Sequence, residues 1–129
     1  MKVLPLFRSV AVVCACLFAA HFAAVAAAEE TIGLRILFLG DNGHHRPADR
    51  FKQIEPLLRR HRIELDYTES LDDLNPAKLT GYDCLTIYAN WTRISPDQEQ
   101  ALLDFVAHGG GFVPLHCASY CFLNSPKYI

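Results

Sequence analysis

The sequence predicts an α/β protein built on a doubly wound parallel sheet. Two observations support this fold class: short apolar segments alternate with helical segments from residue 34 onward, and the links between them are short. Both are typical of strand–helix–strand units joined by right-handed crossovers. Four strands can be identified, in the expected order 2-1-3-4. Because complete sheets of this class usually have more strands, we expect a flavodoxin-like domain that is truncated after the fourth strand.

The first half of the predicted domain consists of two strands on either side of a helical segment. Residues 34–39 form a nearly continuous apolar run, as expected for a strand that is buried on both faces. A polar, turn-rich stretch over residues 40–47 leads into a segment with one apolar helical face. Pro56 lies inside that segment and predicts either a kink or two short helices. Residues 62–67 alternate between polar and apolar side chains, which favours an edge strand.

The second half repeats the alternation. Residues 72–76 are expected to form a loop or a short helical turn, and residues 82–88 form the third predicted strand. Residues 112–116 form the fourth strand, and the chain is expected to turn straight into a helix over residues 117–122.

The helix between the third and fourth strands has clear signals at both ends. Ser95 is expected to cap it, Pro96 fits the first helical position, and Gln98 lies three residues after the cap. Gly109 is well suited to the left-handed position that ends a helix.

The amino-terminal segment, residues 1–28, is typical of a secretory signal peptide. Two basic residues precede an uncharged stretch over residues 10–28, which ends in small residues. The mature chain would then be residues 29–129, a single exported domain that is periplasmic or extracellular and meets the membrane only through its signal peptide. An uncleaved membrane anchor and lipoprotein processing at Cys16 stay open as alternatives.

The distribution of charge argues against a nucleic-acid partner. The chain has 12 basic and 14 acidic residues, and the basic ones are scattered apart from a short cluster near residue 60. A nucleic-acid partner would require a clustered basic face, so none is expected.

After residue 28 the cysteines are Cys84, Cys117 and Cys121. Their odd number argues against a disulfide framework.

Three loops leave the carboxyl ends of strands and should lie close together. Their chemically capable residues are Asp41, Asn42, His44, His45, Tyr88, Asn90, Trp91, His116 and Cys117. Cys117 is the sharpest candidate, because a thiol between a strand and a helix has its pKa lowered by the helix dipole and can act as a nucleophile. The alternative is that Cys117 is a small buried apolar residue.

The histidines and the tryptophan each allow two interpretations. His44 and His45 could act as a base or as ligands, or could be solvated loop residues. His116 is a candidate substrate contact, although strand alternation points it away from Cys117 and favours a structural role. Trp91 could be a platform for a sugar ring or a lid packed on the core. No cofactor is predicted, and a divalent metal is left open because the histidine spacing matches no compact zinc motif.

Four stretches together resemble the ThuA-like (trehalose-utilisation) family, within the class I glutamine-amidotransferase-like superfamily. They are residues 40–45 after the first strand, Tyr82 and Asp83, residues 88–91, and the glycine-led segment 109–119. The resemblance covers residues 34–129. It implies a domain linked to trehalose or related sugar metabolism, which binds or transforms a sugar derivative at the carboxyl edge of the sheet. The expected acid/base or nucleophilic groups are His44, His45 and Cys117, and the expected sugar contacts are Asp41, Asn42, Asn90, Trp91 and His116.

Glutaminase activity is not expected. Amidotransferases carry their nucleophile in a Gly-x-Cys-x-Gly turn, and here Cys117 stands at the nucleophile position while both flanking glycines are replaced. Their histidine and glutamate partners lie well downstream of the cysteine, beyond Ile129, and a thiolate needs such partners for this chemistry. Two other interpretations stay open: a non-catalytic binding or structural module, and an inactive truncated domain of a larger exported protein.

Overall fold

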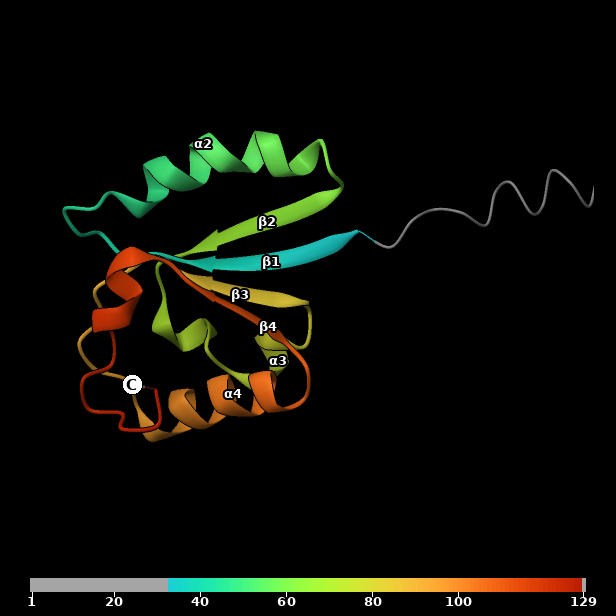
Figure 1. Cartoon of the computed structure of the whole chain (residues 1–129). Coiled ribbons are helices and arrows are strands. Elements are labelled where there is room, and N and C mark those ends of the chain that lie inside the picture. The colour runs from blue at the N-terminus through green and yellow to red at the C-terminus, as the bar shows by residue number, and fades with distance from the viewer. Residues whose placement is uncertain (1–32, 129) are drawn as a thin grey trace, which may run out of the picture. The chain divides into compact units, whose positions relative to one another are not determined.

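A computed structural model describes residues 33–128, so the predicted signal peptide lies outside the described residues. Four parallel strands form one sheet in the order β2-β1-β3-β4, which confirms the predicted fold class and strand order (Figure 1). The strands are β1 (Leu34–Leu39), β2 (Ile63–Thr68), β3 (Cys84–Ile87) and β4 (Gly111–Pro114). As predicted, the second strand lies at an edge of the sheet.

Helices cover both faces of the sheet. Figure 1 shows α2 on one face and α3 and α4 on the other, as is usual for a parallel sheet. The helices are α2 (Pro47–Arg59), α3 (Pro76–Leu79) and α4 (Pro96–Ala107), together with two 3-10 helices, η1 (Leu71–Asp73) and η2 (His116–Tyr120).

The helix α2 is one continuous element, so of the two alternatives predicted for Pro56 the pair of short helices is wrong, and the kink stays a prediction. The part of the helix before the proline packs against the sheet. The ring of Phe51 lies 6.3 Å from that of Phe38 on β1 and 5.2 Å from that of Tyr67 on β2, measured between ring centroids. Tertiary contacts of this kind can outweigh the local preference of a proline to end a helix.

The main core lies between the sheet and α4. Buried side chains of β1 and β3 pack there against Ala101 and Leu102 of α4 and against Ala118, Cys121 and Phe122 after β4. The two ends of α4 form as predicted. Ser95 and Gln98 make a reciprocal capping box, and Gly109 adopts a φ of 96° just after the helix.

The chain departs from the predictions after β4. The strand ends at Pro114, two residues earlier than predicted, and the helix expected over residues 117–122 is a 3-10 helix that begins at His116. The backbone turns at His116, which has a φ of 47°. None of the helices between residues 33 and 128 is long and apolar enough to cross a bilayer.

Candidate functional site

A buried carboxylate joins the loop after β1 to the loop after β3. The side chain of Asp41 is 8% exposed and accepts hydrogen bonds from the backbone N–H of Gly43 at 2.8 Å and of Asn90 at 2.6 Å. A side chain at position 43 would force this carboxylate to shift, because a Cβ there would lie 2.8 Å from an oxygen of Asp41. Asp41 was predicted to contact the substrate; the structure gives both of its oxygens backbone partners, and a substrate contact stays a prediction.

Further hydrogen bonds bring the segment after β4 into the same assembly. The indole N–H of Trp91 donates to the carbonyl of Gly40 at 2.9 Å, and the carbonyl of Trp91 accepts from the N–H of Phe122 at 2.7 Å. The thiol of Cys121 donates to the carbonyl of Ala89 at 3.0 Å. The three loops at the carboxyl ends of β1, β3 and β4 are therefore held together, as the sequence predicted.

These loops line an open hollow with a volume of about 620 Å³. Its lining residues are Asp41, Asn42, Gly43, His44, Asn90, Trp91, Thr92 and Tyr120. We call this space the carboxyl-edge hollow. It contains five of the eight predicted site residues, and it adds Thr92 and Tyr120, which sequence reasoning missed. Trp91 packs against the core, as its description as a lid requires, and it also lines the hollow; its role as a platform for a sugar ring stays a prediction.

Beside the hollow, three imidazole rings and a phenol form a cluster. The ring of His45 lies 3.9 Å from that of His44 and 4.8 Å from that of His116, between centroids, and the ring of Tyr88 lies 6.0 Å from that of His45. Partial burial lowers the pKa of His45 below its usual 6.5, and electrostatic interaction with the neighbouring imidazoles of His44 and His116 lowers it further, against the opposing effect of Asp41. The lowered pKa favours the uncharged imidazole of His45, the form that can accept a proton.

The position of His116 corrects the argument from strand alternation. That argument required the strand to continue to residue 116, whereas β4 ends at Pro114 and His116 has a left-handed backbone conformation. The turn brings its exposed ring next to His45 and Tyr88.

Within residues 33–128, no group of three or more histidine, cysteine or carboxylate side chains is arranged to hold a metal ion.

Cys117 does not have the environment that was expected of a nucleophile. Its side chain is 8% exposed and it does not line the carboxyl-edge hollow. Burial raises the pKa of its thiol, and the electrostatic effect of Asp41 raises this pKa further, whereas a backbone hydrogen bond lowers it. The expectation that a helix dipole lowers this pKa is not met, because η2 is a single short 3-10 helix and desolvation outweighs its field.

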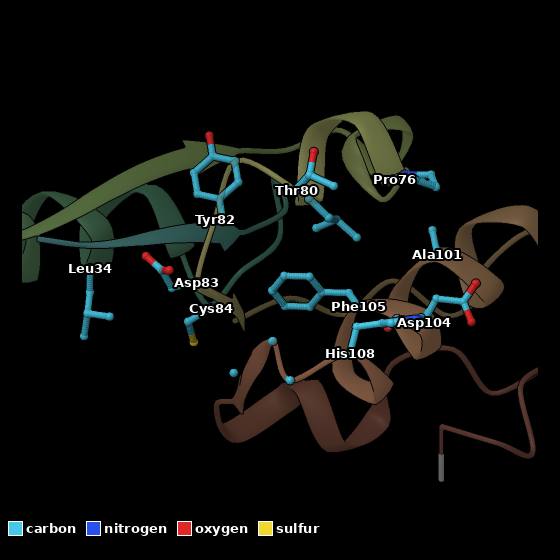
Figure 2. Close-up of a pocket in the computed structure, with 14 residues that line it drawn as sticks. Leu34, Pro76, Thr80, Tyr82, Asp83, Cys84, Ala101, Asp104, Phe105 and His108 are labelled. Carbon is cyan, nitrogen blue, oxygen red and sulfur yellow. The ribbon is translucent and has the colours of Figure 1, made fainter. Parts of the chain in front are cut away.

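A second hollow, of about 930 Å³, lies at the opposite edge of the sheet, where β1, β3 and β4 begin (Figure 2). Most of its polar side chains already have protein partners. The hydroxyl of Tyr82 donates to Asp66 at 3.0 Å, and the carboxylate of Asp83 accepts from the N–H of Arg35 at 2.8 Å. By contrast, the side chains of Asn42, Asn90 and Thr92 in the carboxyl-edge hollow make no hydrogen bond to any residue between 33 and 128. The smaller hollow is therefore the better candidate site.

Comparison with known proteins identifies the family. The family model described as ThuA, trehalose utilisation, matches residues 35–129. The chain belongs to the ThuA family. No curated protein matches the chain. Among solved structures it resembles two ThuA-like proteins, one from Bacteroides uniformis ATCC 8492 and one from Parabacteroides merdae ATCC 43184.

Both ThuA-like structures share the fold with low sequence identity. The Bacteroides protein is 18% identical with a TM-score of 0.58, and the match covers 74% of this chain and 39% of that one. The Parabacteroides protein is 16% identical with a TM-score of 0.63, and the match covers 75% of this chain and 37% of that one. This ThuA chain therefore spans less than two fifths of the length of either structure.

Proposed function

We propose that this ThuA domain binds a sugar or sugar derivative in the carboxyl-edge hollow. The observation that carries the proposal is the combination of polar side chains without protein partners and an anchored aromatic ring. Asn42 and Asn90 each offer an amide that can donate to one sugar hydroxyl and accept from another. Trp91 is fixed by its bond to Gly40 and offers an apolar surface for a ring. The description of the family, trehalose utilisation, agrees with a carbohydrate ligand.

The chemistry that the site can offer is proton transfer. His45 has a lowered pKa and lies beside His44, which lines the hollow. An uncharged imidazole in that place can act as a general base. The buried thiol of Cys117 favours a second candidate function, a binding module without turnover, because the residue at the expected nucleophile position has a raised pKa.

A test of sugar binding can use the intrinsic fluorescence of Trp91, the single tryptophan of the chain. We expect trehalose to change this fluorescence, and Asn42→Ala to weaken binding about fivefold, the effect of one lost neutral hydrogen bond of about 1 kcal/mol. Gln53→Ala removes an amide on α2, away from the hollow, and serves as the control. Equal affinities for these two variants, or no response to trehalose, glucose and their derivatives, would refute the proposal.

We also propose that the domain acts after export, in the periplasm or outside the cell. The charge and small-residue pattern of residues 1–28 supports this. Mass spectrometry of the protein recovered from its native cells should then find Glu29 at the amino terminus, and an intact Met1 would contradict export by cleavage.

A further inference from the structure

A second aromatic side chain, Tyr120, lines the carboxyl-edge hollow together with Trp91. Tyr120 is 61% exposed, and among residues 33–128 its side chain has neither a hydrogen-bond partner nor an aromatic neighbour. A single exposed aromatic residue is common on protein surfaces. Tyr120 differs from such residues because it lines a polar hollow together with Trp91, whose indole is held by a hydrogen bond, and this position suggests that it contacts a ligand.

The backbone around Tyr120 is tied to the loop that carries Trp91. The next residue, Cys121, is fully buried and donates its thiol proton to Ala89, and Phe122 donates its N–H to the carbonyl of Trp91. The indole of Trp91 is itself held by Gly40. The loops that carry Trp91 and Tyr120 are therefore connected by hydrogen bonds. The two rings do not stack on each other in the described part of the chain.

The charges around the hollow restrict the ligand. Its lining includes the carboxylate of Asp41 and no lysine or arginine. An anionic ligand such as a sugar phosphate would meet a carboxylate and find no guanidinium or ammonium group to bind it. Uncharged hydroxyl groups, by contrast, match the free amides of Asn42 and Asn90.

We propose that Tyr120 and Trp91 together form an aromatic platform for the apolar C–H face of a pyranose ring, so that the ligand is a cyclic, uncharged sugar. This inference rests on the proposed sugar-binding function and adds a residue and a ligand class to it. Burying a C–H face on an aromatic ring removes apolar surface from water, which an open-chain polyol with the same hydroxyl groups cannot do to the same extent.

The experiment compares three probes, methyl α-glucopyranoside, glucitol and glucose 6-phosphate, by calorimetry and by Trp91 fluorescence. For the glucopyranoside we expect Tyr120→Ala to lower the affinity about fivefold to tenfold, and Tyr120→Phe, which keeps the ring, to stay within about twofold of the parent. Glucitol should bind more weakly and equally to the parent and to Tyr120→Ala. Glucose 6-phosphate should bind more weakly than the glucopyranoside.

Controls separate this inference from the function on which it rests. Leu123→Ala removes an exposed apolar side chain that does not line the hollow, and it should bind like the parent. Because Tyr120 has no partner in the described fold, Tyr120→Ala should melt within a few degrees of the parent. If the parent binds the glucopyranoside and Tyr120→Ala binds it equally well, the aromatic platform is refuted while sugar binding stands. If glucose 6-phosphate binds more tightly than the glucopyranoside, the inference of an uncharged ligand is refuted while sugar binding stands. If the parent binds none of the probes, both proposals fail.

Discussion

Asp41→Asn should destabilise the domain more than its small change in shape suggests. Each carboxylate oxygen of Asp41 accepts one backbone N–H, from Gly43 and from Asn90. An amide keeps one acceptor oxygen but places an NH₂ group against the second N–H, so a buried donor loses its partner. Losing a hydrogen bond to a charged group costs about 1.5–3 kcal/mol, which corresponds to a fall in Tm of roughly 10 °C for a domain of this size.

The assay for this prediction is thermal and urea unfolding of the parent and two matched variants. Asp97→Asn makes the same chemical change at an exposed position in the first turn of α4, where only the helix dipole is affected, and should cost less than about 1 kcal/mol. Trp91 fluorescence should also shift in Asp41→Asn, because Asn90 is released next to it. An Asp41→Asn variant as stable as Asp97→Asn would show that this carboxylate does not hold the two loops together.

Two further predictions concern the histidine cluster and the thiols. The pKa of His45, followed by NMR, should lie below 6.5 and should rise in His116→Gln, because the electrostatic interaction with His116 that lowers it is removed. The lowered pKa means that the folded state binds fewer protons than the unfolded state, so His45 should reduce stability as the pH falls below about 6.5. An unchanged pKa in the variant would contradict the contact. Iodoacetamide at neutral pH should label the half-buried Cys84 before the buried Cys117 and Cys121, because the reagent reaches a half-buried thiol more easily. Burial raises the pKa of all three thiols, that of Cys121 to about 11, so labelling should be slow overall. Peptide mapping that found Cys117 labelled first would restore it as a nucleophile.

Local sequence signals predicted the sheet and the ends of α4 because each depends on residues that are close in the chain. The apolar run of β1 and the Ser95–Gln98 capping box are examples. The continuity of α2 was not predictable in this way. Local signals also do not show that Phe51 packs against Phe38 and Tyr67, which come from other elements.

The same limit applies to the site. Sequence reasoning placed His44, Asn90 and Trp91 in loops that should meet, and the structure brings them together. It extended the fourth strand to His116, whereas β4 ends at Pro114 and the backbone turns at His116; the substrate contact and the structural role considered for this residue both stay predictions. It also missed Tyr120, whose position depends on long-range bonds around it, between Cys121 and Ala89 and between Phe122 and Trp91.

The proline at the end of β4 affects how the sheet can be extended. Gly111 donates its N–H to the carbonyl of Asp83, just before β3, and Leu115 donates to the carbonyl of Ile87 in β3. Strand alternation therefore directs the backbone groups of Phe112 and Pro114 away from β3. Pro114 has no N–H, and this outer side of β4 therefore offers two carbonyl acceptors but the single donor of Phe112. A second molecule that tried to add its own strand here would leave one of its carbonyls without a partner. A proline at such a position disfavours edge-to-edge aggregation while leaving the bonds to β3 intact.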